Sequence, residues 1–316
     1  MPGKKIIVVF GATGAQGGGL VRAILSDPES EFSVRAVTRD VHSEKAIELA
    51  NSGAEVVSAD IDDLESVKSA LKGAFGAYFV TFFWAHFSPE RELEEAENMA
   101  RAAKDQGLHH VIWSTLENTR DYIPLEDNRM PTLMGKYKVP HFDAKGEANK
   151  FFYDYGVPTT YLLTSFYWDN LVYFGMGPKK NEEGKLVLTF PMGDKKLSGI
   201  AAQDIGRAAY GIFKKGAELV GQTVGIAGEH LTGNEMAAAL SKALGEEVSY
   251  QQISFDAYRS LGFPGADDLG NMFQFYHDFA EEFAAKRSVD FTRELDPALQ
   301  SFDKFLAENA KKLPLD

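Results

Sequence analysis

Three glycines near the start of the chain have the spacing of a phosphate-binding turn. Gly11, Gly14 and Gly17 follow the apolar run at residues 6–10 and precede the helix-like stretch at residues 20–25. A buried strand, a tight turn and the first turn of a helix are the elements expected here. Glycine allows positive φ and close backbone approach, and the free N–H groups of a helix start bind anions. The pattern predicts a diphosphate cradle; the alternative is a glycine-rich turn that binds no ligand.

Arg39 ends the second predicted strand, about 20 residues after the glycine turn. At this place in dinucleotide-binding folds an acidic residue binds the ribose 2′-hydroxyl of NAD, whereas an arginine accommodates the 2′-phosphate of NADP. A guanidinium holds a phosphate through two parallel hydrogen bonds. Arg39 therefore predicts NADP(H) as the cofactor. Asp40 leaves two alternatives open, because it could pair with Arg39 or accept a hydrogen bond from a ribose.

Other candidate contacts stand at the ends of the next predicted strands. Asp60 and Ile61 end the third strand, and Thr81, Phe82 and Phe83 end the fourth. The carboxyl ends of parallel strands meet at one edge of a sheet, so these residues are predicted to line one extended crevice. The first two would flank the adenine and the other three the central riboses. Each residue taken alone is also compatible with a structural role.

His141 and Lys145 are four positions apart, so on a helix they share one face. Short-chain dehydrogenases carry Tyr-x-x-x-Lys on the helix after the fifth strand, where the lysine holds the nicotinamide ribose and the tyrosine protonates the substrate. A histidine stands at the tyrosine position here. Lys145 is predicted to hold the cofactor, with a solvated surface lysine as the alternative. His141 is either a catalytic acid or a structural residue at the helix start.

The composition is that of an ordinary globular protein and excludes several kinds of chemistry. The 316 residues are 44% hydrophobic and 25% charged, with a net charge of −13 and no cysteine. The acidic balance argues against binding to nucleic acid or anionic membranes, and the missing cysteines exclude disulfides and thiol catalysis. The seven histidines lack the spacing of a metal site. With no signal-peptide core or membrane span expected, the predicted location is the cytoplasm, with the nucleus as the alternative.

Strands and helices alternate through the first half of the chain. Strands are expected at residues 33–38, 54–58, 77–82, 110–113 and 159–163, and helices at 43–50, 64–71, 89–105 and 142–153. This alternation predicts an α/β fold with a doubly wound parallel sheet of the Rossmann type. We expect a dinucleotide-binding domain at residues 1–163. A smaller α+β region for substrate or partner is expected at 164–316, with some of its segments returning to the sheet.

Several motifs along the chain resemble those of one family. They are VFGATGAQGG at 9–18, VTR at 37–39, HFDAKGE at 141–147, YWDNL at 167–171 and LGFPGADDLGNMF at 261–273. The chain resembles the NmrA-like proteins, which are atypical members of the short-chain dehydrogenase superfamily. The last motif resembles the branch named NmrA-like family domain-containing protein, which also lacks the tyrosine of Tyr-x-x-x-Lys.

The resemblance implies a set of cofactor contacts that includes the candidates above. A segment after the sixth strand joins them, beside the nicotinamide. The implied contacts are Gly11, Ala12, Thr13, Gly14, Ala15, Gln16, Gly17, Arg39, Asp60, Ile61, Thr81, Phe82, Phe83, Lys145, Ser165, Phe166, Tyr167 and Trp168. The chain departs from the branch in two places. Glu94 replaces a lysine, which weakens the implied phosphate grip, and the stretch 120–136 is longer and could reshape the substrate side.

Two functions are compatible with these residues. Because the usual catalytic tyrosine is missing, the sequence favours an NADP(H)-binding, redox-responsive regulator in which cofactor occupancy changes partner binding. The alternative is an NADPH-dependent oxidoreductase that reduces a quinone or carbonyl compound. The expected partner is accordingly a regulatory protein or a small substrate, and a homodimer is allowed. A purely structural interaction protein, in which the fold is vestigial and binds no nucleotide, is the third alternative.

Overall fold

A parallel seven-stranded sheet forms the central layer of residues 3–315, the part of the chain that the computed structural model describes. The strand order is β11-β6-β5-β4-β1-β2-β3, and every neighbouring pair is parallel. The strands are β1 (Lys5–Val9), β2 (Phe32–Thr38), β3 (Glu55–Ser58), β4 (Gly76–Phe79), β5 (His110–Thr115), β6 (Thr159–Leu163) and β11 (Thr223–Gly225).

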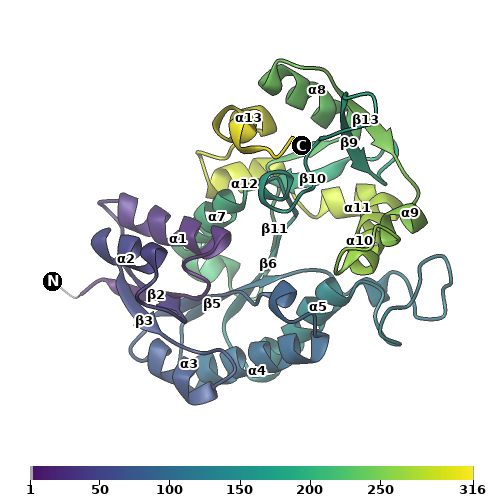
Figure 1. The fold of residues 1–316 in the computed structure, drawn as a ribbon. Helices are drawn as coiled ribbons and strands as arrows, with labels where there is room; N and C mark the ends of the chain where they lie inside the picture. Colours follow the sequence, from purple (N-terminus) through teal and green to yellow (C-terminus); the bar gives the residue numbers. More distant parts are fainter. Residues whose placement is uncertain (1–2, 316) are drawn as a thin grey trace.

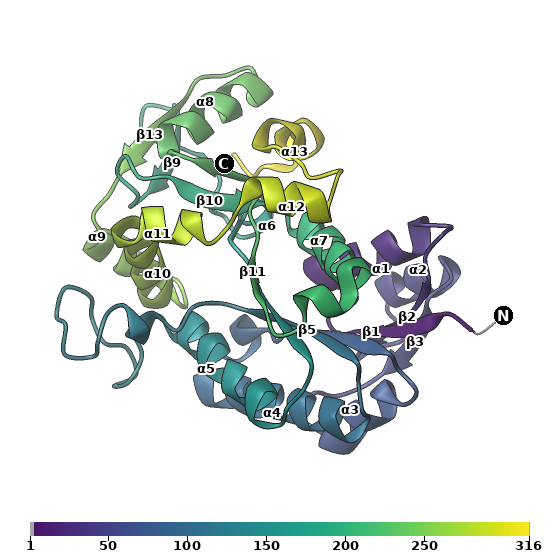
Figure 2. The same cartoon turned by 180° about the vertical axis from the view of Figure 1, so that it is seen from behind.

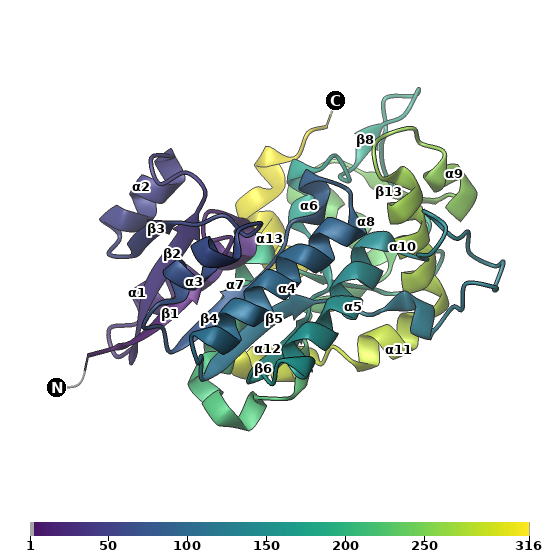
Figure 3. The same cartoon turned by 90° about the horizontal axis from the view of Figure 1, so that it is seen from below.

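Helices cover both faces of this sheet, which confirms the predicted doubly wound fold (Figure 1). One face carries α1 (Ala15–Ser26), α2 (Glu44–Asn51) and α7 (Ala202–Lys215). The other carries α3 (Leu64–Leu71), α4 (Pro89–Asp105) and α5 (Pro140–Asp154), which lie side by side in Figure 3. Alternate residues of β1 explain the two layers, because Ile7 and Val9 face α1 and α7 while Val8 faces α3 and α4.

The strand order reverses at β1, which lies between β4 and β2. Val9 pairs with Ala36 of β2 on one side and with Tyr78 of β4 on the other. The chain runs outward from β1 through β2 and β3, then returns to β4 on the opposite side of β1. Ligands of open α/β sheets bind outside the carboxyl ends of the strands at such a reversal. The glycine turn after β1 stands at this point.

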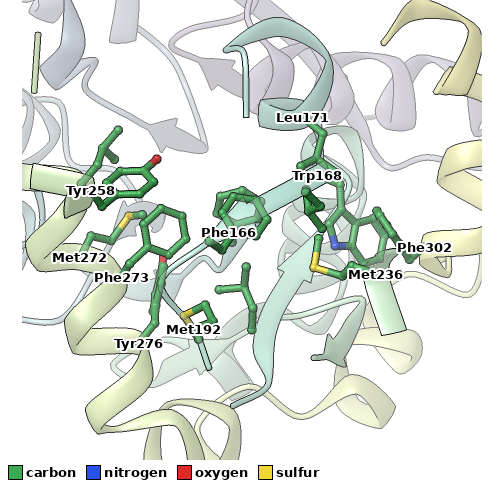
Figure 4. Packing of buried hydrophobic residues seen from close by; sticks show 14 of the residues in the cluster. Phe166, Trp168, Leu171, Met192, Met236, Tyr258, Met272, Phe273, Tyr276 and Phe302 are labelled. Atoms are coloured by element: carbon green, nitrogen blue, oxygen red, sulfur yellow. The ribbon is translucent and has the colours of Figure 1, made fainter. Parts of the chain in front are cut away.

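The second half of the chain builds two small sheets and a cluster of helices around a third core. One sheet has the order β12-β10-β7 and the other β13-β9-β8. Large apolar side chains fill the space between them and the helices, as Figure 4 shows for Phe166, Trp168 and Phe273. The strands are β7 (Phe166–Tyr167), β8 (Lys179–Lys180), β9 (Leu186–Phe190), β10 (Leu197–Ile200), β12 (Glu229–Leu231) and β13 (Val248–Gln252).

Short helices connect these strands and close the C-terminal region (Figure 2). Helix α8 begins with a capping box, in which the side chains of Thr232 and Glu235 each bond the other's backbone N–H. The α-helices are α6 (Asp169–Tyr173), α8 (Gly233–Leu244), α9 (Phe255–Arg259), α10 (Ala266–Asp278), α11 (Ala280–Ala285), α12 (Val289–Leu295) and α13 (Phe302–Asn309). The 3₁₀ turns are η1 (Phe83–Ala85), η2 (Thr119–Asp121), η3 (Gly216–Leu219) and η4 (Ala310–Lys312).

Two elements from the second half belong to the sheet layer. Strand β11 pairs with β6 at one edge, and α7 packs directly on α1. The two helices approach closely because Gly206 of α7 has no side chain at the contact with α1. A Cβ on Gly206 would lie 2.1 Å from the backbone nitrogen of Leu20. The chain thus crosses the predicted boundary at residue 163 and returns to the sheet.

The stretch before α5 is a long irregular segment held by buried polar groups. The Lys138 ammonium is 1% exposed and donates 2.8 Å hydrogen bonds to the carbonyl oxygens of Asp127 and Met130. The Asn271 amide of α10 donates to the Lys138 carbonyl oxygen, and the Asp143 carboxylate accepts from the Lys138 backbone N–H at 2.8 Å. These bonds attach residues 127–138 to α5 and α10.

Candidate functional site

The turn after β1 has the geometry that a pyrophosphate cradle requires. Gly11 has a φ of +65°, a conformation that side-chain-bearing residues rarely adopt. A Cβ on Gly17 would lie 2.4 Å from the Gly11 carbonyl oxygen, so only glycine fits there. Gly14 caps α1, and no side chain among residues 3–315 bonds the first turn of the helix as a cap. The N–H groups at this helix start are therefore left for an anion.

Gln16 connects this turn to three strands through a buried hydrogen-bond network. Its carbonyl oxygen accepts from the hydroxyls of Tyr78 and Ser114, the latter at 2.9 Å. Its amide donates to the Tyr167 hydroxyl at 2.6 Å. Burial raises the pKa of Tyr167 to about 12, so this hydroxyl stays protonated at neutral pH. The network fixes the first turn of α1 against the ends of β4, β5 and β7.

Arg39 is exposed directly after β2 and is available to a ligand. No side-chain hydrogen bond or ion pair of its guanidinium is found within residues 3–315. The Asp40 carboxylate accepts instead from the His42 backbone N–H at 2.8 Å, and the described part of the chain shows no ion pair between Arg39 and Asp40. The surface pair that the sequence left open is thus not formed in this structure.

The predicted adenine end contains polar groups from two elements. The Asp60 carboxylate accepts from the Asp62 backbone N–H at 3.1 Å, and the Ile61 carbonyl oxygen accepts from the Asn98 amide of α4 at 3.1 Å. A polar depression of about 530 Å³ lies beside them, lined by Asp62, Ser88, Glu90, Arg91, Glu94 and Asn98. Glu94 therefore adds negative charge beside the predicted adenine end.

Lys145 is anchored at the end of β4 by a buried acid. Its ammonium lies 2.6 Å from the Thr81 hydroxyl, 3.2 Å from the Thr81 carbonyl oxygen and 2.6 Å from Glu92 Oε1. Glu92 is fully buried on α4, and Thr81 donates to the same carboxylate oxygen at 2.5 Å. The Lys145 ammonium also lies 5.5 Å from the centre of the Trp113 ring. Lys145 is thus a fixed, nearly buried cation beside the predicted ribose segment, which excludes the solvated surface lysine.

A second acid, Glu95, is buried one turn further along α4. Its carboxylate lies 3.6 Å from His86 Nε2 and 3.3 Å from Arg91 Nε, and its side chain is 4% exposed. Burial, reinforced by the charges of Glu92 and Asp62, raises the pKa of Glu95 to about 7. Within residues 3–315 the atoms Glu92 Oε2, Glu95 Oε2 and His86 Nε2 are buried without a hydrogen-bond partner.

The raised pKa of Glu95 makes stability depend on pH. The folded chain keeps a proton that the unfolded chain, with a pKa of 4.5, releases, so the free energy of unfolding falls as pH rises from 4.5 to about 7. We expect Glu95→Gln to remove this fall, worth about 1–3 kcal/mol. Urea unfolding at pH 5 and pH 8 measures it. The exposed neighbour variant Glu94→Gln should leave the pH slope unchanged; an unchanged slope in Glu95→Gln would contradict the assignment.

His141 is held by an acid from the C-terminal region. Its Nδ1 lies 2.6 Å from Asp268 Oδ1, and its backbone N–H donates to Asp268 Oδ2 at 3.2 Å. The imidazole is stacked on Phe142, with ring centres 4.9 Å apart, and the Trp84 ring lies 4.8 Å away. His141 and Asp268 are 7% and 4% exposed. The pair joins α5 to α10 one helical turn from Lys145.

The remaining predicted residues lie in different environments. The fourth strand was predicted to end at 81–83, but β4 ends at Phe79: Phe82 follows it and is 57% exposed, whereas Phe83 begins η1 and is buried beside Trp84. The side chains of Phe166 and Trp168 lie in the third core, where the Trp168 indole packs against aromatic rings of α13 (Figure 4). The Ser165 hydroxyl is buried without a hydrogen-bond partner in the described chain. Contact of these residues with a cofactor stays a prediction.

Two other features are absent from residues 3–315. No helix in this range is long and apolar enough to cross a lipid bilayer. No three histidine, aspartate or glutamate side chains in the same range gather in a geometry that could hold a metal ion.

Comparison with known proteins decides the family. The sequence model of the NmrA-like family matches residues 3–313, nearly the whole chain. The chain belongs to the NmrA-like family. This NmrA-like chain is 29% identical over 258 residues to an NmrA-like family domain-containing protein of Dictyostelium discoideum, with 79% of this chain and 81% of that protein covered. It is 28% identical over 290 residues to the NmrA-like family domain-containing oxidoreductase FrzB of a Cladobotryum species, with 85% and 83% covered.

Solved structures share the NmrA-like fold. NmrA, described as a negative transcriptional regulator and solved in complex with NADP, superposes with a TM-score of 0.78 at 22% identity, covering 98% of this chain and 96% of that one. The Citrobacter triphenylmethane reductase, solved with NADP(H), gives a TM-score of 0.73 at 22% identity, with 96% and 99% covered. At these identities the likeness shows the fold, which confirms the predicted architecture.

Sequence reasoning missed the acids that hold the two central side chains of this NmrA-like site. Glu92 and Glu95 occur in a highly charged helix, which suggests a solvated face. Glu92 nevertheless stands four and seven positions before Ala96 and Met99, so all three lie on the buried face of α4. This helical spacing was the signal from which the burial of Glu92 could have been predicted. Asp268 lies in the motif at 261–273, but no local pattern indicates its contact with His141, which is 127 residues away.

Proposed function

We propose that this NmrA-like chain is an NADP(H)-dependent oxidoreductase that reduces a flat carbonyl or quinone compound. The observation that carries the proposal is the fixed Lys145 ammonium at the end of β4, on the same sheet edge as the glycine turn. A cation at this place would hold the hydroxyls of the nicotinamide ribose. The relatives named as oxidoreductases support the same reading.

The chain's own residues supply binding and orientation in this proposal. The N–H groups at the start of α1 would hold the pyrophosphate, and the Arg39 guanidinium would hold the 2′-phosphate. Lys145, fixed by Thr81 and Glu92, would orient the nicotinamide ribose. The bound dinucleotide would supply a hydride to the substrate. Exposed Phe82 and the half-buried Trp84 would offer apolar contact to a flat substrate beside it.

The proposed activity is tested by following NADPH oxidation with quinones, aldehydes and ketones, and by identifying the reduced product. We expect stoichiometric conversion of at least one substrate class, faster with NADPH than with NADH at equal concentration. NADPH binding without turnover of any substrate would contradict the oxidoreductase and favour the regulator described next. Absence of any nucleotide binding would contradict both.

Arg39 is the residue that should decide between the two dinucleotides. We expect Arg39→Gln to weaken NADPH binding about 10–100-fold, because a charge-assisted bidentate contact is lost, while NADH binding stays unchanged. Fluorescence titration of both nucleotides measures the change. The matched control is Arg101→Gln, which changes an exposed arginine of α4 and should alter neither affinity. Equal losses for NADPH and NADH in Arg39→Gln would contradict the assigned role.

A redox-responsive regulator is the second candidate, and it was the function that the sequence alone favoured. The replacement of the usual tyrosine by His141 supports it, as does the likeness in fold to NmrA. A regulator of this kind requires that NADPH and NADP⁺ bind two states of the protein with different free energies. Sedimentation and limited proteolysis with either nucleotide test it. An identical oligomeric state and digestion pattern with both would contradict it.

A further inference from the structure

The contact between His141 and Asp268 fixes which nitrogen of the imidazole bonds the acid and which is left for another partner. A carboxylate only accepts hydrogen bonds, so the 2.6 Å contact requires the proton on Nδ1 to point at Asp268. Nε2 is then the atom left for another partner, and no hydrogen bond to it is found within residues 3–315. The second oxygen of Asp268 holds the His141 backbone N–H at 3.2 Å, so the helix start and the ring are positioned together.

Aromatic side chains place this imidazole beside the predicted cofactor segment. Its ring centre lies 4.8 Å from Trp84 and 5.9 Å from Phe83, which follow directly on the Thr81–Phe82 pair. Gly265 caps α10 with a φ of +83°, and a Cβ there would lie 2.8 Å from the Trp84 ring. A glycine at this position therefore lets the start of α10, which carries Asp268, approach Trp84 and His141.

We propose that His141 is the proton donor of the reduction and that Asp268 is the positioning residue that holds its ring and its tautomer. This inference rests on the proposed oxidoreductase function. It gives a role to the motif at residues 261–273, which none of the expected cofactor contacts uses. It also assigns the proton-donor role that has no residue when the usual tyrosine is missing.

The proposed step balances as a carbonyl reduction. The carbonyl carbon gains a hydride from the cofactor, and the electron pair of the C=O π bond moves to the oxygen. The Nε2–H bond of the His141 imidazolium breaks, its proton forms the O–H bond of the alcohol, and the electron pair stays on Nε2. The neutral imidazole then regains a proton from water. A quinone needs this proton less, because the hydroquinone anion it forms is a much weaker base than an alkoxide.

The charges that face His141 are compatible with an imidazolium. Asp268 approaches from α10, and Lys145 lies one turn further along α5. The Lys145 cation is balanced by Glu92 of α4 at 2.6 Å, so it does not act on His141 as an uncompensated charge. His86 follows η1, with its ring centre 6.0 Å from the Phe83 ring, and burial lowers its pKa, so it adds no positive charge at neutral pH.

The first test compares two substrate classes in one variant. We expect His141→Gln to lower kcat for a ketone or aldehyde about 10²–10⁴-fold, the usual contribution of a general acid, while a quinone loses much less. NADPH affinity, measured by fluorescence titration, should not change. Equal losses for both classes, or an unchanged kcat for carbonyl reduction, would overturn the role of His141. A wild-type protein without turnover would instead overturn the proposed function itself.

The second test separates positioning from folding. We expect Asp268→Asn to lower kcat for a ketone or aldehyde about 10-fold or more while KM and NADPH affinity stay unchanged, because an amide can donate as well as accept and no longer fixes the proton on Nδ1. The matched control is Asp267→Asn, which removes the same charge from an exposed neighbour on the same turn of α10. A kcat of Asp268→Asn equal to that of the control would overturn the inference. Should His141→Gln fail to fold, this comparison of kcat values remains decisive.

Discussion

Lys145→Met should destabilise the folded chain by about 3–5 kcal/mol, because the fully buried carboxylate of Glu92 would lose its only cationic partner within 4 Å in the described chain. Thr81 alone would then donate to that carboxylate. The same variant should also lose NADPH oxidation, since the ammonium is the proposed ribose contact. Urea unfolding monitored by circular dichroism measures the first effect and an NADPH assay the second.

A double variant separates the two effects. Lys145→Met combined with Glu92→Gln replaces both charges by neutral groups, so most of the lost stability should return while turnover stays absent. Lys150→Met removes an exposed lysine of α5 that pairs with Glu147 at 2.8 Å, and it should change stability by less than about 0.5 kcal/mol. A single Lys145→Met variant as stable as the wild type would contradict the buried ion pair. Recovered turnover in the double variant would contradict the role of Lys145.

Gly17→Ala should lower the affinity for NADPH about 100-fold. The added Cβ would lie 2.4 Å from the Gly11 carbonyl oxygen, so the turn must shift and misalign the N–H groups that would hold the pyrophosphate. The same overlap should cost about 1–3 kcal/mol of stability. Titration of NADPH fluorescence, together with urea unfolding, measures both quantities.

Gly19→Ala provides a matched comparison on the same helix. Its Cβ would lie 2.4 Å from the Gln203 carbonyl oxygen, so the clash is equally close but falls between α1 and α7 rather than in the turn. We expect a similar loss of stability with NADPH affinity nearly unchanged. If both variants lose affinity equally, the effect comes from the packing of α1 and the turn has no special role.

Local signals predicted most of the sheet layer. The strand at 159–163 and the helix at 89–105 have the predicted bounds, because each is bracketed by turn or cap residues in the sequence. The β1 turn was also predictable, since positive φ at Gly11 requires glycine. For the second half only an α+β region was predicted, because pairings such as that of β10 with β12, across 32 positions, are not encoded by any local pattern.

The parts of the candidate site that lie close together in the sequence were predictable. The contacts between residues far apart in the sequence were not. The spacing of His141 and Lys145 was visible in the sequence, but the acids that hold them come from α10 and α4. Lys145 was predicted to hold the cofactor, and the structure adds a contact with Glu92 that the sequence did not indicate. Buried acids resemble solvated ones in sequence, because burial depends on which helix face meets the core.

The most direct measurement of the central claim is a crystal structure of the full chain grown with NADP⁺. We predict the pyrophosphate against the N–H groups at the start of α1, the 2′-phosphate at Arg39 and the nicotinamide ribose within hydrogen-bond distance of Lys145. Electron density for the dinucleotide at another place, or a glycine turn without it at saturating nucleotide, would contradict the account.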